Sequence, residues 1–340
     1  MTRVLRPCAR LVIGIVVVVI LALPLPAWAT PWTGLVVFGD SLADMGNAFA
    51  LSGGVFPPSP PYAGTFSNGP VSAEYLAGHL GVPLAPSTSG GTNFAVAGAT
   101  TGLLNYNFEV NFPNGINQIP AFKNTGIAGQ IGQFQASNPV FDPATTLFMV
   151  WGGPNDIFLA QDTNADVVAA ATQAVQNLAG DVLALAQLGA QHFLVPNMPD
   201  LGRTPFAISL GPLAQAQLEQ LSAGFDAGLA AAMDQVENLF GLDVRVFDTF
   251  TLMNAILDNP AASGFTDTTT PCIATPAVGT GCAGFVFFDP VHPTTAAHAR
   301  LGAGFASAVP LPTPLTLVLG GLALLGLARP RRAHPRQSAA

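Results

Sequence analysis

Charged side chains are scarce in this sequence. Only 9 % of its 340 residues are Asp, Glu, Lys or Arg, against roughly 25 % in an average soluble protein. Seven of the eleven basic residues lie at the two ends. The body between Thr30 and Pro310 therefore holds four basic residues against all nineteen carboxylates, a formal charge of −15. Such a body repels phosphate backbones, which excludes nucleic acid as a partner.

Cysteine is the next shortage, with only Cys8, Cys272 and Cys282 in the chain. Because Cys8 falls in a segment that we expect to be removed, the other two remain as a pair within a Thr-, Pro- and Gly-rich stretch. In an exported protein we expect this pair to form a disulfide, with two free thiols as the alternative. No spacing typical of metal ligands surrounds them. Residues 162–166 mimic the start of a calcium loop but lack its glycine, so the sequence predicts no metal site.

Between its ends the sequence has neither an internal repeat nor a linker rich in Pro, Gly or Ser. This absence predicts a single domain over residues 30–308. Before it, three arginines, the apolar run Leu11–Leu23 and the segment Ala27–Ala29 form the pattern of a secretory signal peptide. We expect signal peptidase to remove residues 1–29. An uncleaved membrane anchor is the alternative, which the shortness of the apolar run disfavours.

Residues 309–340 form a second sorting signal, built from a Val-Pro-Leu-Pro segment, the apolar run Leu315–Ala328 and an arginine-rich end. The pattern resembles the PEP-CTERM class of bacterial sorting tails, in the VPLPA-type variant with Leu311 at the third signature position. The resemblance implies transient membrane anchoring by the apolar helix and cleavage by an exosortase-type enzyme. An ordinary membrane anchor is the alternative. Together the two ends predict an exported protein of the bacterial cell envelope, cell surface or extracellular space.

Short apolar runs alternate with amphipathic patterns through the body. Five runs are typical of buried strands, at residues 35–38, 93–96, 146–151, 192–196 and 244–247. Apolar residues at 3,4 spacing predict helices at residues 168–185, 218–236 and 294–306. The alternation indicates a parallel sheet with helices on both faces, in which ligands bind beyond the carboxyl ends of the strands. Residues 51–61 and 103–134 fit no strong period, and we expect them to be loops that contact the substrate.

A serine follows the first expected strand, in the sequence Gly39-Asp40-Ser41-Leu42. A serine at the carboxyl end of a buried strand, next to a glycine that allows a tight turn, is well placed for nucleophilic attack. The alternative is an ordinary Asp-Ser turn or helix cap. Near the other end of the body, Asp289 and His292 are three residues apart, a spacing at which the carboxylate reaches the imidazole Nδ1–H. No other histidine has an acid partner at such a spacing, so His292 is the expected base.

Two further positions are candidates to stabilise an oxyanion. Gly98 follows the expected strand at residues 93–96 and offers its backbone N–H with no side chain in the way. Asn155 comes after the strand that ends at Trp151 and offers its side-chain amide. Taken singly, each position is also explained as turn chemistry. The sequence has no G-x-S-x-G elbow, because Ala43 stands at the second glycine position, which excludes the hydrolase fold built on that motif.

In this order, the segments around Ser41, Gly98, Asn155 and Asp289–His292 resemble the four sequence blocks of the GDSL, or SGNH-hydrolase, family. The resemblance implies a flavodoxin-like three-layer α/β/α sandwich with a mainly parallel five-stranded sheet. It implies Ser41 as nucleophile, His292 as general base and acid, and Asp289 as the carboxylate that orients His292. It also implies an oxyanion hole formed by the N–H groups of Ser41 and Gly98 and by the Asn155 side chain.

The expected function is that of an exported serine esterase or lipase, which hydrolyses carboxylic esters through an acyl-Ser41 intermediate and needs no cofactor. Lipid esters, short-chain esters and acylated glycans all remain open as substrates. Two alternatives keep the same fold. One is a non-catalytic cell-surface protein, and the other is an acyltransferase that passes the acyl group to an alcohol.

Overall fold

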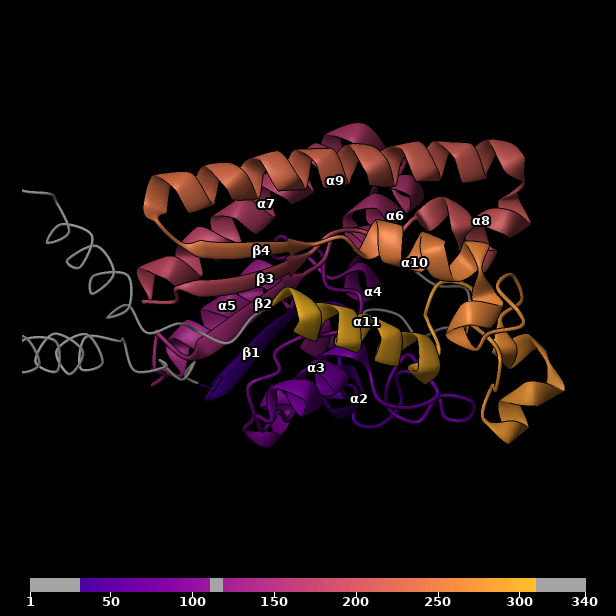
Figure 1. The fold of residues 1–340 in the computed structure, drawn as a ribbon, viewed down its shortest axis with the longest axis horizontal. Helices are drawn as coiled ribbons and strands as arrows, with labels where there is room; N and C mark the ends of the chain where they lie inside the picture. The colour runs from indigo at the N-terminus through magenta and orange to yellow at the C-terminus, as the bar shows by residue number, and fades with distance from the viewer. Residues whose placement is uncertain (1–30, 111–118, 310–340) are drawn as a thin grey trace, which may run out of the picture. The chain divides into compact units, whose positions relative to one another are not determined.

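The computed structural model describes residues 31–110 and 119–309 of the chain, drawn as a ribbon in Figure 1. The expected signal peptide at residues 1–29 and the expected sorting tail from Pro310 onward lie outside these residues. Across the two described ranges, no helix is both long enough and apolar enough to cross a membrane.

Four parallel strands form a sheet in the described part of the chain: β1 (Gly34–Gly39), β2 (Thr146–Trp151), β3 (His192–Pro196) and β4 (Asp243–Phe247). They lie in the order β1-β2-β3-β4, and each pair is parallel. The residues of β1, β2 and β3 are almost all buried, as expected for parallel strands covered on both faces. These strands correspond to four of the five that the apolar runs predict.

The fifth expected strand, at residues 93–96, is not a regular strand, so the prediction of a five-stranded sheet was wrong in this detail. The segment lies beside β1 through one parallel bridge to Val37 and a hydrogen bond from Phe94 N to Val37 O (2.7 Å). The ladder is interrupted because the Gly39 N–H donates to Gln130 Oε1 (2.9 Å) instead of to this segment, although Val96 N still donates to Gly39 O (3.1 Å). The segment still comes next to β1 in space. Counted with it, the strand order is 2-1-3-4-5, the order of flavodoxin-like folds.

Helices cover both faces of the sheet and make a three-layer α/β/α sandwich (Figure 1). Successive side chains of the strands alternate between two core clusters, so that Phe148 belongs to one and Met149 to the other. The first cluster includes side chains of α5 (Ile127–Ala136), α7 (Val167–Gln187) and α9 (Pro212–Phe240). The second includes side chains of α3 (Ser72–Leu80), α10 (Thr249–Asp258) and α11 (Thr295–Ala308). Shorter helices are α2 (Asn47–Leu51), α4 (Tyr106–Glu109), α6 (Pro154–Asp162) and α8 (Pro205–Leu210).

The 3,4 apolar spacing predicts three helices, and α7, α9 and α11 lie at those places. Residues 103–134 differ from the expected loop, because they contain α4 and the ten-residue α5. Helix α5 buries Ile127, Ile131 and Phe134 on one face. Its sequence pattern is weak because Gly and Gln separate these residues. Residues 111–118 of this stretch lie outside the described ranges.

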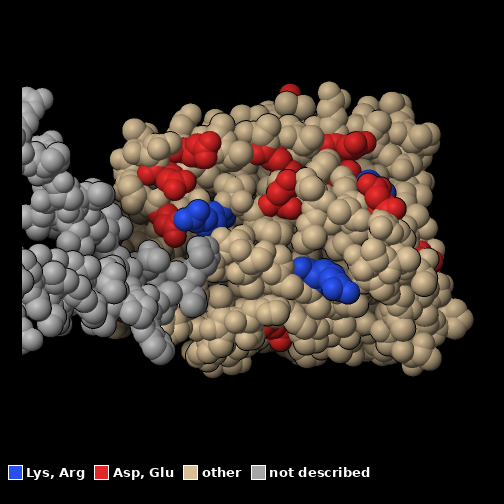
Figure 2. All heavy atoms as spheres, in the orientation of Figure 1, with Lys and Arg blue, Asp and Glu red and all other residues tan. Residues whose placement is uncertain are grey.

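The surface repeats the charge imbalance of the sequence. Most of the face in Figure 2 is uncharged, and acidic side chains are more frequent on it than basic ones. Two of the few basic side chains pair locally with carboxylates, Arg203 with Asp258 and Arg245 with Asp243, each at 2.6 Å. The described ranges contain only four basic residues, Lys123, Arg203, Arg245 and Arg300, so these ranges offer no broad basic patch to an anionic polymer.

Candidate active site

Ser41 lies in the turn that follows β1, at the carboxyl edge of the sheet. At Gly39 a Cβ would lie 2.6 Å from the carbonyl oxygen of Trp151 on β2, so only glycine fits. The Asp40 side chain then closes the turn, because its Oδ1 accepts a hydrogen bond from Leu42 N (3.0 Å). Ser41 is only 9 % exposed and lines a pocket. The turn therefore places the largely buried Ser41 hydroxyl at the edge of the sheet where ligands bind.

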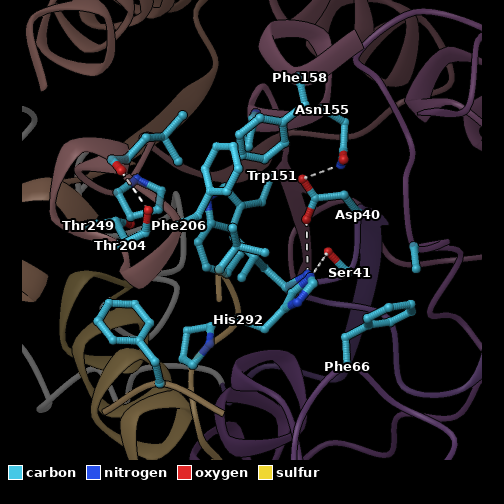
Figure 3. Close-up of a pocket in the computed structure, with 18 of the residues that line it drawn as sticks. Asp40, Ser41, Phe66, Trp151, Asn155, Phe158, Thr204, Phe206, Thr249 and His292 are labelled. Carbon is cyan, nitrogen blue, oxygen red and sulfur yellow. Dashed lines mark hydrogen bonds between the residues drawn. The ribbon is translucent and has the colours of Figure 1, made fainter. Parts of the chain in front are cut away.

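A second turn, from Asp289 to His292, brings the expected base to Ser41 from 251 residues away. Asp289 Oδ1 accepts hydrogen bonds from the N–H groups of Val291 (2.9 Å) and His292 (2.7 Å), which closes this turn. Asp289 Oδ2 lies 2.6 Å from His292 Nδ1. His292 Nε2 lies 2.8 Å from Ser41 Oγ, a bond that can be followed in Figure 3. With the ring proton on Nδ1, Nε2 is an acceptor for the serine hydroxyl proton.

Asp289 is only 3 % exposed, yet its surroundings favour the charged carboxylate. Burial raises its pKa, but the charge of His292 and hydrogen bonds from His292, Val291 and Tyr62 lower it by more. The net pKa of Asp289 is below its ordinary value. The Tyr62 hydroxyl, 2.7 Å from Asp289 Oδ2, is a contact that the sequence analysis missed. Tyr62 lies 227 residues earlier, and no motif or spacing links the two residues.

Two backbone N–H groups beside Ser41 Oγ are available to a ligand. Within the described residues, neither Ser41 N nor Gly98 N donates a hydrogen bond, and both residues line the same pocket. Gly98 has a φ of +82°, and a Cβ there would collide with the Asn107 side chain. Glycine is therefore required on both counts. Its N–H can approach a substrate oxygen without a side chain in between.

Asn155 lines the pocket from the start of α6. Its Nδ2 donates to Ala99 O (3.1 Å) and, over a longer distance, to Asp40 Oδ2 (3.3 Å). Figure 3 shows Asn155 next to Asp40, close to Ser41. The neighbouring Asp156 accepts from the N–H (2.9 Å) and hydroxyl (2.8 Å) of Thr101. This pair of bonds ties the Asn155 segment to the chain that carries Gly98.

Asp40 is another buried carboxylate of this site, and it accepts side-chain hydrogen bonds only from uncharged groups in the described chain. Burial raises the pKa of Asp40 to about 7, against the lowering effects of the Leu42 N–H and the charge of His292. Burial also raises the pKa of Asp156 to about 6, although Thr101 donates to it twice. Both groups therefore titrate near neutral pH. They differ in this from Asp289, which stays ionised there.

One wall of the pocket is apolar and reaches into the core. It includes Trp151, at the end of β2, and Met253 and Leu257, four residues apart on one face of α10. Of the two segments expected to contact substrate, residues 103–134 contribute Tyr106 and Asn107, and residues 51–61 contribute nothing to the lining. The segment at 51–61 instead leads into Tyr62, which contacts Asp289.

A disulfide joins Cys272 and Cys282, whose Cα atoms are 5.7 Å apart. Both cysteines pack with Phe288 in a small buried cluster, and Tyr62 lies against this cluster. Because Phe288 directly precedes Asp289, the disulfide braces the chain next to the turn that carries His292.

Metal ligands are not gathered in the described ranges: no group of three or more His, Cys, Asp or Glu side chains there is arranged to hold an ion. Asp166, from the segment that mimics a calcium loop, caps α7 instead. Its Oδ1 accepts from Val168 N (2.9 Å) and Ala169 N (3.1 Å).

The sequence places this chain among known proteins. Residues 35–305 match the family model described as GDSL-like Lipase/Acylhydrolase. The chain belongs to this family. Thermolabile hemolysin of Vibrio parahaemolyticus is 29 % identical in an alignment of 287 residues that covers 78 % of this chain and 60 % of the hemolysin. Phosphatidylcholine-sterol acyltransferase of Aeromonas hydrophila is 28 % identical in an alignment of 311 residues that covers 78 % of this chain and 87 % of that protein.

The chain thus spans less than two thirds of the hemolysin. Among solved structures, an acetyl xylan esterase of Geobacillus stearothermophilus aligns with a TM-score of 0.44 and 14 % identity. That alignment covers 84 % of this chain and 98 % of the esterase.

Proposed function

We propose that this GDSL-family chain is an exported serine esterase or lipase that hydrolyses carboxylic esters through an acyl-Ser41 intermediate. The proposal rests on one arrangement of side chains. His292 Nε2 lies 2.8 Å from Ser41 Oγ, and His292 Nδ1 lies 2.6 Å from the buried, ionised Asp289. This is the geometry that nucleophilic catalysis by a serine requires. Membership of the lipase/acylhydrolase family supports it.

Acylation begins when Ser41 Oγ attacks the ester carbonyl carbon and His292 Nε2 takes the hydroxyl proton. Asp289 stabilises the imidazolium that results and holds its Nδ1–H in place. The carbonyl π electrons move onto the oxygen and give a tetrahedral oxyanion. As this collapses, the C–O bond to the alcohol breaks and His292 returns the proton to the leaving oxygen. Water then attacks the acyl-Ser41 ester by the same route, with His292 as base and then as acid.

The oxyanion is stabilised by donors that are in place before the substrate arrives. The N–H groups of Ser41 and Gly98 are free of other partners in the described chain. The Asn155 amide supplies the third donor when its longer bond, 3.3 Å to Asp40, is exchanged for one to the oxyanion. Each such donor contributes about 10²–10³ to the rate in enzymes of this type.

The substrate is proposed to be a neutral ester whose acyl group lies along the apolar wall of Trp151, Met253 and Leu257. Burying each methylene there contributes about 0.8 kcal/mol to binding, so turnover should rise with chain length until the wall ends. Lipid esters, short-chain esters and acylated glycans all satisfy the chemistry of Ser41. The acyl-length profile distinguishes the first class from the other two.

Export is proposed from the two ends of the sequence. Residues 1–29 would be removed by signal peptidase, and residues 309–340 would serve as a sorting tail cut by an exosortase-type enzyme. The hydrolase domain would then span residues 30–308. The buried disulfide between Cys272 and Cys282 supports this, because such bonds persist mainly in oxidising compartments.

Acyl transfer to an alcohol is a second candidate function. It uses the same acyl-Ser41 intermediate, with an alcohol in place of water in the second step. It is favoured by the similarity to the Aeromonas hydrophila acyltransferase, which covers 87 % of that protein. Product analysis with a sterol or fatty alcohol present separates the two reactions. Ester products indicate transfer, and free acid alone indicates hydrolysis.

The experiment that tests the proposal compares the purified protein with its Ser41→Ala variant on p-nitrophenyl esters from acetate to palmitate. A chelator is present throughout. We expect the parent to be active and Ser41→Ala to lose at least about 10⁴-fold in kcat/KM. A folded parent that is no faster than Ser41→Ala on every ester, with or without an alcohol, would favour a non-catalytic surface protein.

A further inference from the structure

All four strong acceptor positions of the Asp289 carboxylate are occupied. Oδ1 accepts from the N–H groups of Val291 (2.9 Å) and His292 (2.7 Å). Oδ2 faces both His292 Nδ1 (2.6 Å) and Tyr62 Oη (2.7 Å). A carboxylate has about four lone-pair sites, so no site is left for water. The same oxygen that holds the imidazole is therefore shared with a phenol.

Tyr62 reaches this oxygen from outside the turn that carries His292. Its ring packs edge-on against Phe288 (centroids 5.3 Å apart) and at a tilt against Phe66 (5.4 Å). Phe66 in turn lies against the His292 ring, with centroids 4.9 Å apart. The phenol is thus held by contacts on both sides of the Asp289–His292 pair. Its position does not depend on the hydrogen bond alone.

We propose that Tyr62 is a positioning residue of the catalytic site, whose hydroxyl fixes Asp289 Oδ2 and limits how strongly this oxygen attracts the His292 proton. The inference rests on the proposed function of Ser41, His292 and Asp289. Tyr62 touches neither Ser41 nor His292 through a hydrogen bond in the described chain. It acts through Asp289 alone.

The electrostatic consequence follows from how a shared acceptor divides its charge. A phenol O–H that donates to Oδ2 withdraws negative charge from it, so less remains to stabilise the imidazolium at Nδ1. Without the hydroxyl, Oδ2 keeps that negative charge and stabilises the imidazolium more strongly. Burial and the Asp289 charge both raise the pKa of Tyr62, so the phenol remains a donor throughout the working pH range.

Two other titratable groups act on His292 in the described chain. One is Asp40, whose pKa burial raises to about 7. The other is His298, whose pKa burial lowers to about 3, so that it is neutral at working pH and accepts from Ser72 N (3.2 Å). Neither is hydrogen-bonded to Tyr62 in the described chain, so removal of the Tyr62 hydroxyl leaves their hydrogen bonds unchanged.

The test is Tyr62→Phe, which keeps the ring and its packing and removes only the hydroxyl. We expect kcat to fall about 10-fold with KM changed less than about 2-fold, because a hydrogen bond to a charged group is lost but no substrate contact is. We also expect the acid limb of the kcat/KM profile to move up by about 0.3–0.5 pH unit. A role limited to holding the loop in place would lower stability and leave the acid limb where it is.

Tyr75→Phe is the matched control. Tyr75 is also partly buried, and its hydroxyl bonds to Thr295 Oγ1 (2.9 Å), a side chain outside the Ser41, His292 and Asp289 set. The control should keep both kcat and the position of the acid limb. Thermal unfolding of both variants beside the parent shows whether either change disturbs the fold.

A second readout does not need turnover. In protein labelled with ¹⁵N-histidine, the His292 ring resonances, assigned with His292→Gln, are titrated with pH in the parent and in Tyr62→Phe. An upward shift of the midpoint in Tyr62→Phe alone supports the proposal, even if no ester turns over and the proposed function fails. Superimposable titrations and pH profiles in the parent, Tyr62→Phe and Tyr75→Phe overturn it, while ester turnover that depends on Ser41 would still stand.

Discussion

Two buried aspartates flank the Ser41–His292 pair, and the pKa values of their carboxyls move in opposite directions. Asp40 is 2 % exposed and Asp289 is 3 % exposed, so burial opposes their charges to a similar extent. Burial raises the pKa of Asp40 to about 7, because its hydrogen-bond donors, Leu42 N and the Asn155 amide, are uncharged. The pKa of Asp289 is lowered, because the charge of His292 and four hydrogen bonds outweigh burial.

The comparison shows that partners, rather than burial or position in the sequence, decide which carboxylate carries charge at neutral pH. Asp40 adjoins the nucleophile, yet it is not bonded to His292 in the described chain. Asp289 is distant in sequence and is bonded to the ring. The predictions that follow test this division of roles between the two carboxylates and their surroundings.

The largest effect is expected from the pair Asp289→Asn and Asp40→Asn. Asp289→Asn removes the charge that stabilises the imidazolium and should lower kcat by about 10³–10⁴. Asp40→Asn replaces a group that is already half neutral near pH 7 and should lower kcat by no more than about 10-fold. Steady-state kinetics on one p-nitrophenyl ester at pH 7.5 gives both values. Equal losses would remove the distinction between the two residues.

Asn155 lies on the Asp40 side of the site, and its loss tests the oxyanion contacts. Asn155→Ala should lower kcat by about 10²–10³ with little change in KM, because the missing donor acts on the transition state. Asn238→Ala on α9 is the control, since it removes an exposed amide that bonds only to the backbone oxygen of Asp234 (2.7 Å) in the described chain. A loss in KM with kcat retained would instead place Asn155 in ground-state binding.

The turn that carries Asp289 lies next to a disulfide, whereas no disulfide lies next to Asp40 in the described chain. Replacing both Cys272 and Cys282 by Ser should lower the free energy of unfolding by about 2–3 kcal/mol, the value for a loop with a sequence separation of 10. Urea unfolding measures this change. The same variant should lose its activity at a lower temperature than Tyr75→Phe does, because the disulfide packs beside Phe288. Unchanged stability would mean that aromatic packing alone holds this turn.

Asp181 on α7 is, like Asp40, a buried aspartate with a raised pKa. Burial and the nearby charge of Asp156 raise the pKa of Asp181 to about 8, and its Oδ2 has no partner in the described chain. Because the pKa of Asp181 is higher in the folded protein than in the unfolded chain, its contribution to stability is fully present below about pH 4 and is lost as the pH rises towards 8. Asp181→Asn does not titrate. It should therefore match the parent near pH 4 and be more stable by about 2 kcal/mol or more at pH 9.

Urea unfolding at these two pH values measures the difference. Asp234→Asn, which removes an exposed carboxylate from α9, is the control for net charge. If Asp181→Asn gains no more stability at pH 9 than this control does, burial of the Asp181 charge does not destabilise the folded protein, and the prediction is wrong.

Much of this fold follows from local sequence. β2 and β3 coincide with apolar runs of six and five residues, because the sheet is covered on both faces. α7 and α9 coincide with 3,4 spacing, because each helix buries one face. Ser41 and Asn155 were placed correctly at the strand ends because the carboxyl edge of a parallel sheet gathers such residues. Their chemical roles remain proposals.

The features that the sequence did not predict share a different cause. The ladder beside β1 is interrupted where Gln130 accepts the Gly39 N–H, an interaction between residues 91 apart in sequence. The apolar pattern of α5 is interrupted by Gly and Gln, and its three buried apolar residues form a packed face only when β1 and α7 are in place. Tyr62 follows an aperiodic, proline-rich segment, and its contact with Asp289 depends on the whole fold. Local patterns carry no information about such contacts.

The central claim is that His292 activates Ser41. Its most direct test is covalent labelling with a fluorophosphonate probe, followed by peptide mass spectrometry of the full chain and of the His292→Gln variant. The account predicts a single adduct on Ser41 in the parent and labelling at least about 10³-fold slower in His292→Gln. An adduct on another residue, or equal labelling of Ser41 in both proteins, would contradict it.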